Sequence, residues 1–124
     1  MTEAVEAAVK ELQAEYQVTV EPEDQGGAYV TVDAVDLGPK WQPNTTQIEF
    51  VIAYNYPFAA IYPYYARPDL QRADGRAWPS ALQRVSWRGR DLIQVSLRCN
   101  RWQPAHDTAS NSLRMVIHWF HTCS

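Results

Sequence analysis

The sequence predicts an α+β domain in which an antiparallel β-meander sheet is packed by an N-terminal and a C-terminal helix. Three patterns carry this expectation: apolar residues at helical spacing near the start, strict alternation over residues 46–54, and a second helical stripe over residues 107–120. The predicted order is therefore helix, strands, a long irregular crossing and helix.

Length and composition bound the number of domains. A chain of 124 residues, 46% of them hydrophobic, can bury one core and hardly two, so we expect one domain over residues 1–124. No apolar run approaches the roughly 20 residues of a membrane helix. The acidic start at Glu3 also differs from a basic secretion signal. These features predict a cytoplasmic protein without membrane contact.

Residues 2–15 have the pattern of an amphipathic helix. Glu3 and Glu6 fall in its first turn, where the helix dipole favours negative charge. Its apolar residues share one face: Val5, Ala8, Val9, Leu12 and Tyr16.

Three segments then have strand character. Residues 17–20 look extended, Gly26-Gly27 marks a turn, and residues 28–32 are rich in β-branched and aromatic side chains, so a hairpin is expected. Residues 46–54 alternate in polarity and form the strongest predicted strand. Its apolar side carries Ile48, Phe50, Ile52 and Tyr54.

The second half is expected to be less regular. Residues 56–65 hold two prolines and four tyrosines, which favours a rigid loop with edge pairing over residues 62–66. Residues 67–91 are arginine-rich and interrupted by proline and glycine, so we expect a long loop with a short strand over residues 85–87. Residues 92–97 form another short strand candidate.

The last predicted helix begins after Asp107, which is the expected N-cap. Its apolar stripe consists of Ala109, Leu113, Val116, Ile117 and Phe120.

Charge is sorted along the chain. Residues 1–66 carry ten acidic side chains and two lysines, whereas residues 67–124 carry nine arginines and four aspartates. Arginine suits planar contacts with carboxylates or phosphates. The pI of about 5.5 and the absence of a nucleic-acid motif disfavour nucleic acid, and favour a solvated face or an acidic protein partner.

The cysteines and histidines do not predict a cofactor or a metal site. Two cysteines are too few for a disulfide framework and lack the paired spacing of structural zinc, so free thiols are expected. His118, His121 and Cys123 gather near the C-terminus, but three such residues without a fourth are more typical of a polar tail.

Two motifs lie at matching places in this order of elements. Tyr56-Pro57-Phe58 follows the strongest strand, and residues 102–105, Trp-Gln-Pro-Ala, precede the last helix. Together they resemble the ubiquitin-conjugating-enzyme fold, whose members carry Tyr-Pro-Phe and Trp-Ser-Pro-Ala at these places. The resemblance covers nearly the whole chain and is greatest to the truncated, divergent versions in bacterial ubiquitin-like conjugation operons. The C-terminal helices of full-length eukaryotic members have no counterpart.

The family's catalytic residues are not matched. Its cysteine lies eight residues before the tryptophan, and the same count from Trp102 gives Gln94, whose amide cannot carry a thioester. The family's His-Pro-Asn tripeptide is also missing upstream, where Gln83-Arg84-Val85 stands. The stretch after Tyr-Pro-Phe is longer than usual by roughly a dozen residues, so the local alignment is open to a shift.

Cys99 is the leading alternative acyl acceptor. It is flanked by Arg98 and Arg101, a basic setting that would favour the thiolate. The competing interpretation is an ordinary small residue in the turn before the tryptophan. Ser96 is a weaker oxygen nucleophile because it has no positioned base in view.

Other residues near this position have a binding or a structural interpretation. Arg98, Arg101, Trp102 and His106 are candidate binding residues, although Trp102 also suits buried packing and His106 an exposed helix start. Three further tryptophans in loop-like segments suit either an interface or local packing: Trp41, Trp78 and Trp87.

The resemblance implies a conjugating-enzyme-like component that works with an activating enzyme and a ubiquitin-like modifier, in operons often linked to phage defence. The loss of the usual cysteine equally fits an inactive member that binds a modifier or partner as a scaffold. Arginine-driven nucleic-acid binding is a third, less favoured alternative.

Overall fold

The computed structural model describes residues 1–123, and it confirms the predicted α+β class. Helix α1 spans Glu3–Glu15, with Thr2 as N-cap, where the side-chain oxygen accepts a hydrogen bond from the Val5 N–H at 3.2 Å. Four of the five predicted apolar residues are its buried ones: Val5, Ala8, Val9 and Leu12. The helical spacing therefore identified the face that packs on the sheet.

The first strands form the predicted meander. Strand β1 (Gln17–Pro22) pairs with β2 (Ala28–Asp36), and β2 pairs with β4 (Thr45–Ile52), both antiparallel. The β2–β4 register shifts between Val32 and Val35, around a bulge that extends β2 beyond the predicted range. Tyr54 lies past the end of β4 and is 54% exposed, so the apolar side predicted for this strand ends at Ile52.

The short strands expected over residues 85–87 and 92–97 are present, but both begin earlier in the chain and both belong to the same sheet. Strand β7 (Leu82–Trp87) and strand β8 (Arg90–Val95) form a hairpin, and β8 pairs with β5 (Tyr64–Ala66). The strand order is β1-β2-β4-β5-β8-β7. Strand β5 is therefore interior, with partners on both sides, and the expectation of edge pairing is wrong.

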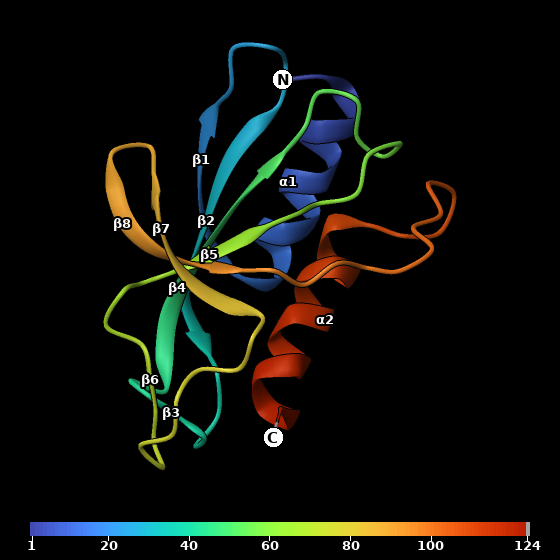
Figure 1. Cartoon of the computed structure of the whole chain (residues 1–124). Helices are drawn as coiled ribbons and strands as arrows, with labels where there is room; N and C mark the ends of the chain where they lie inside the picture. Colours follow the sequence, from blue (N-terminus) through green and yellow to red (C-terminus); the bar gives the residue numbers. More distant parts are fainter. Residues whose placement is uncertain (124) are drawn as a thin grey trace.

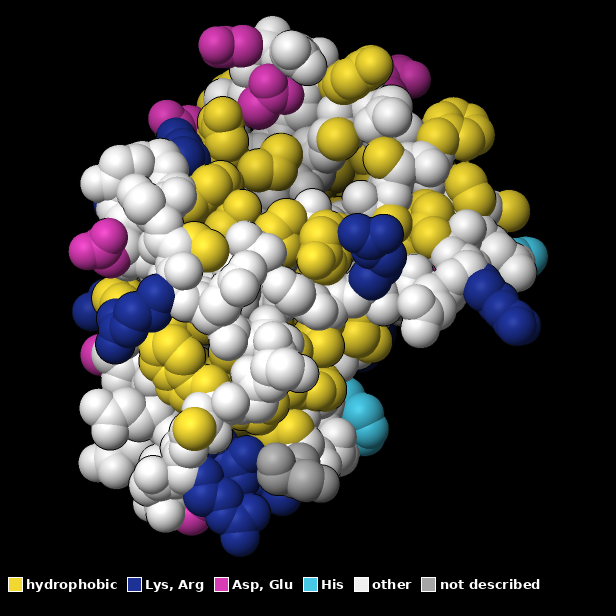
Figure 2. Space-filling view, in the orientation of Figure 1, with side chains coloured by type: hydrophobic (Ala, Val, Ile, Leu, Met, Phe, Trp, Pro, Cys, Tyr) yellow, Lys and Arg dark blue, Asp and Glu magenta, His cyan; other side chains and the backbone are white. Residues whose placement is uncertain are grey.

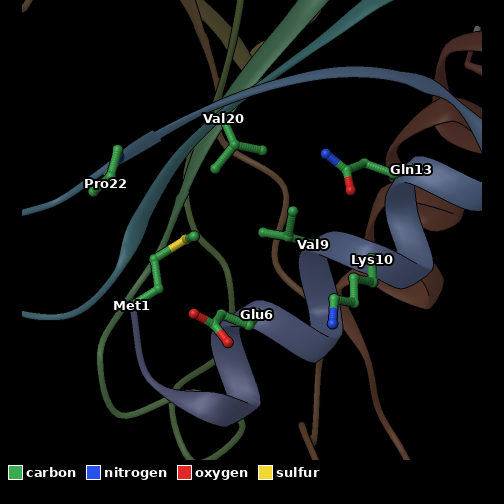
Figure 3. Close-up of a pocket in the computed structure, with 7 residues that line it drawn as sticks. All are labelled: Met1, Glu6, Val9, Lys10, Gln13, Val20 and Pro22. Carbon is green, nitrogen blue, oxygen red and sulfur yellow. The ribbon is translucent and has the colours of Figure 1, made fainter.

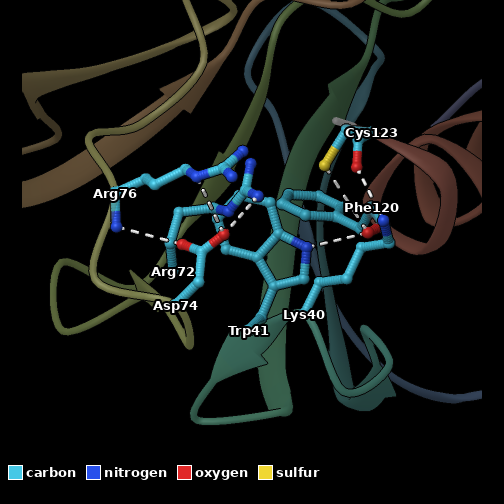
Figure 4. Close-up of polar contacts among 7 residues, drawn as sticks. All are labelled: Lys40, Trp41, Arg72, Asp74, Arg76, Phe120 and Cys123. Atoms are coloured by element: carbon cyan, nitrogen blue, oxygen red, sulfur yellow. Dashed lines mark hydrogen bonds and ion pairs between the residues drawn. The ribbon is translucent and has the colours of Figure 1, made fainter.

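A small second sheet lies at the end of the molecule that holds the C-terminal end of the last helix (Figure 1). It pairs β3 (Trp41–Gln42) with β6 (Gln71–Arg72). The Trp41 side chain is buried, and its Nε1–H donates to the Phe120 carbonyl at 2.8 Å (Figure 4). Trp41 is thus a core residue and does not form an exposed interface.

Helix α2 spans Ala109–Thr122 and lies beside α1 along one side of the sheet (Figure 1). Its N-cap is Thr108, whose side-chain oxygen accepts from the Asn111 N–H at 3.1 Å. The prediction of Asp107 as N-cap is wrong by one residue. Side chains from both helices and from the inner face of the sheet form the core; the largest buried ones include Leu12, Phe50, Tyr64, Leu113 and Phe120.

The tip of the β7–β8 hairpin reaches over the outer face of the sheet. The Trp87 ring stacks on Tyr65 with ring centroids 4.1 Å apart, and the Arg88 guanidinium lies 3.7 Å from the centroid of Tyr29 on β2. Two ion pairs fix this arrangement: Arg88 to Glu21 at 3.1 Å, and Arg90 to Glu49 at 2.6 Å. Acidic residues of the first half of the chain therefore bind arginines of the second.

Over residues 1–123, neither helix has the length and apolar content needed to cross a membrane.

Candidate functional site

The two sequence motifs meet in space. The Trp102 Nε1–H donates to the Pro57 carbonyl at 2.6 Å, and the Trp102 and Tyr56 rings lie 6.4 Å apart. The Tyr56 hydroxyl in turn accepts from the Ala109 N–H at 3.0 Å, in the first turn of α2. Residues that are far apart in sequence thus form one junction between the end of β4 and the start of α2.

A tight turn leads from Trp102 into α2. The Gln103 carbonyl accepts from the backbone N–H groups of His106 and Asp107, and the Asp107 carboxylate accepts from the Gln103 N–H at 2.7 Å. Asp107 therefore closes the turn, and the adjacent Thr108 caps the helix. The sequence placed a capping residue in this region because aspartate and threonine both serve that purpose.

Cys99 lies in the loop between β8 and α2 and is partly buried. Burial raises the pKa of its thiol, and the Asp107 carboxylate raises that pKa further. The expectation that neighbouring arginines would favour the thiolate is therefore wrong. The Arg98 guanidinium instead lies 4.2 Å from the centroid of the Tyr62 ring, and the Arg101 side chain is exposed.

Gln94 is placed differently from Cys99. It lies within β8, between Tyr65 of β5 and Gln83 of β7, and it donates through Nε2 to the Ser96 hydroxyl at 3.0 Å. The residue that matches the family's cysteine by count is thus held in the sheet. Among the two candidates, only Cys99 lies in the loop that joins the sheet to α2.

His106 is exposed in the turn before α2, and its carbonyl accepts from the Asn111 side chain at 3.5 Å. Within residues 1–123, no hydrogen bond, ion pair or ring contact joins His106 to Cys99 or to Ser96. Arg98, Cys99 and Trp102 therefore lie in one loop, and His106 is not positioned there to act as a base.

An exposed aromatic group next to the junction escaped the sequence analysis. Tyr54, Phe58 and Tyr62 are 54%, 78% and 40% exposed, and all lie on the segment between β4 and β5. Figure 2 shows hydrophobic side chains gathered over this segment. The composition of residues 56–65 did not distinguish these side chains, because Tyr56, Tyr64 and Tyr65 of the same segment are buried.

A groove of about 420 Å³ lies between α1 and β1 (Figure 3). Its lining includes Glu6 and Lys10, whose charges are opposite, together with the apolar side chains of Val9 and Val20. The charged side chains that line this groove are therefore balanced.

The histidines and cysteine near the C-terminus have separate contacts. His121 bonds through Nε2 with the Asp36 carbonyl at 2.9 Å, and the Cys123 thiol faces the Phe120 carbonyl. Among the described residues 1–123, no three side chains of histidine, cysteine, aspartate or glutamate gather as a metal site.

A helix, an antiparallel sheet and a helix, with Tyr-Pro-Phe joined to Trp-Gln-Pro-Ala, define an E2-like, or conjugating-enzyme-like, protein. The chain matches Prokaryotic E2 family E over residues 6–122 and belongs to that family. Membership supports a conjugating-enzyme-like role, as the resemblance implied. No curated protein and no solved structure matches the chain.

Proposed function

We propose that this protein is a conjugating-enzyme-like component of a bacterial ubiquitin-like modification pathway, acting in the cytoplasm, with Cys99 as the acyl acceptor. The observation that carries the proposal is the junction of the two motifs through Trp102 and Pro57. Cys99 lies in the loop that leads into this junction, and it is the thiol that this loop offers.

The transfer step exchanges one thioester for another. The Cys99 thiolate attacks the modifier's C-terminal carbonyl, which is held as a thioester on the activating enzyme. The bond from carbon to the activating enzyme's sulfur breaks, and that sulfur leaves as a thiolate, while the Cys99 proton passes to solvent. Because burial and Asp107 raise the thiol pKa, we expect loading to become faster as pH increases.

The test is recovery of the protein from its host under non-reducing conditions, followed by intact mass. Wild type is compared with Cys99→Ala and with Cys123→Ala, in which a buried thiol outside the loop is removed. A modifier-sized adduct that is absent in Cys99→Ala, present in Cys123→Ala and removed by thiol reductant supports the proposal. An adduct that persists in Cys99→Ala contradicts it.

A second candidate is a scaffold that binds a modifier or partner protein without a covalent step. It is favoured by the exposed aromatic group, since Phe58 is 78% exposed beside Tyr54 and Tyr62, and aromatic side chains dominate protein interfaces. Recovery of an activating enzyme or modifier without any adduct, lost in Phe58→Ala and retained in Cys99→Ala, would identify the scaffold. Phe58 is so exposed that its removal should leave the fold intact.

The proposed biological setting is antiphage defence, which rests on the family resemblance alone. Loss of protection against phage after deletion of the gene supports that setting, and unchanged plaque numbers across a phage panel contradict it.

A further inference from the structure

A positively charged pocket lies away from the motif junction, between β6, the turn that follows it, and β7. Its volume is about 290 Å³ and it is open to solvent. It is lined by Gln71, Arg72, Gly75, Arg76, Ala77, Trp78 and Arg84.

One wall of the pocket is a turn held by a shared carboxylate. The Asp74 carboxylate accepts from Arg72 Nη2 at 3.0 Å and from the Arg76 N–H at 3.0 Å, and it lies 3.5 Å from Arg76 Nε (Figure 4). These bonds keep the pKa of Asp74 below its ordinary value, the largest cause being the Arg76 N–H. The Arg72 side chain is 5% exposed, whereas that of Arg76 is 75% exposed. The turn is thus fixed at its base, with one guanidinium directed to solvent.

The opposite wall combines an aromatic ring with a second exposed guanidinium. The Trp78 Nε1–H donates to the Leu70 carbonyl at 3.0 Å, which fixes the ring. The Arg84 guanidinium lies 5.2 Å from the ring centroid. Among residues 1–123, Arg84 has no carboxylate partner, in contrast to Arg88 and Arg90.

The charge of this pocket is unbalanced. The lining holds three arginines and no acidic residue, and the neighbouring Asp74 carboxylate pairs with only two of them, Arg72 and Arg76. The hollow on the outer face of the sheet instead pairs two arginines with Glu21 and Glu49. The groove between α1 and β1 is balanced as well. This pocket therefore combines excess positive charge with an apolar surface.

We infer that this pocket binds an acidic peptide segment of a partner protein, with carboxylates on Arg76 and Arg84 and an apolar side chain against Trp78. Guanidinium groups match the planar carboxylate in geometry and charge. The inference goes beyond the proposed function, because it requires no acyl transfer and no contact with Cys99.

A peptide fits these observations better than a nucleotide or a nucleic acid. The volume of about 290 Å³ lies just below the range of small-molecule sites, which begins at roughly 300 Å³, and the pocket is not enclosed. Nucleic acid requires a basic stripe, but Arg88 and Arg90 are engaged with glutamates of the same chain.

The test follows the Trp78 indole N–H signal in nuclear magnetic resonance spectra of ¹⁵N-labelled protein. The probes are a short peptide of alternating aspartate and leucine, the same peptide with asparagine for aspartate, ATP and an oligothymidine. We expect the aspartate peptide alone to shift the Trp78 signal. Arg84→Gln or Arg76→Gln should weaken binding about tenfold by removing one charge-assisted contact.

The matched control is Arg67→Gln, since Arg67 is exposed, pairs with Asp69 and does not line the pocket. Unchanged signals of the other tryptophans in each variant verify that the fold is intact. No shift at millimolar aspartate peptide, equal weakening in Arg67→Gln, or tighter binding of ATP or oligothymidine overturns the inference.

Discussion

The Tyr56 hydroxyl joins the Tyr-Pro-Phe motif to helix α2 through one hydrogen bond. The Tyr56 side chain is buried, and its hydroxyl accepts the Ala109 N–H, an amide of the first turn of α2 that has no partner within the helix. Tyr56→Phe leaves this amide unsatisfied, so we expect a loss of about 1–3 kcal/mol in the free energy of unfolding in urea. Tyr54→Phe, which changes an exposed tyrosine, should cost less than about 0.5 kcal/mol. Equal effects of the two changes would show that the hydroxyl does not anchor α2.

For individual residues, the sequence identified the segments that form the candidate site, but it did not predict which side chains surround the Cys99 thiol. Tyr56 and Trp102 were recognisable from motifs, and Cys99 was singled out by the arginines that flank it. The raised pKa of Cys99 was not predictable, because it results first from burial of the thiol in the fold and then from Asp107, which the turn closed on Gln103 brings near it. Flanking residues such as Arg98 predict the setting of a thiol only if their side chains turn toward it, and Arg98 turns to Tyr62.

The β7–β8 hairpin is held on the outer face of the sheet by arginine–glutamate pairs. Glu49 is buried on β4, and both of its oxygens accept from Arg90, at 2.6 and 3.2 Å. Glu49→Gln removes this charged pairing and should lower the free energy of unfolding by about 1–2 kcal/mol. Trypsin should then cleave faster after Arg88, because the hairpin tip opens more often. Peptide mapping of a timed digest measures the rate.

Glu11→Gln is the matched control for this prediction. Glu11 is exposed on α1 and makes no ion pair within residues 1–123. Its substitution should leave the cleavage rate after Arg88 unchanged. Cleavage that is equally slow in Glu49→Gln would show that the hairpin tip is held without the Arg90–Glu49 pair, by the Trp87 stacking and the Arg88 contacts.

Elements with a clear hydrophobic period were predictable, and those without one were not. Both helices and the first strands were placed within a few residues because one face of each packs on the core. Strand β7 has only Leu82 buried, and its apolar residues fall at positions 82, 85 and 87 without regular alternation, so only its last residues, 85–87, were predicted. It pairs with β8 across a tight turn at Arg88 and Gly89, which have φ of 51° and 74°.

At the scale of the whole molecule, we expect the chain to unfold as one domain. The helices and the inner face of the six-stranded sheet share one set of core contacts, from Val5 near the start to Phe120 near the end. Urea unfolding followed by far-ultraviolet circular dichroism and by tryptophan fluorescence should give one coincident transition. Separate midpoints for the two signals would indicate two units of different stability.

Several contacts that complete this fold join residues far apart in the chain. The Arg88–Glu21 pair joins residues 67 positions apart. The hydrogen bonds from Trp41 to the Phe120 carbonyl and from Ala109 to Tyr56 join residues 79 and 53 positions apart. During synthesis the meander therefore leaves the ribosome before α2 exists to cover its apolar inner face. Because strands exposed in this way are prone to aggregate, we expect the nascent protein to depend on chaperones until α2 packs on the sheet.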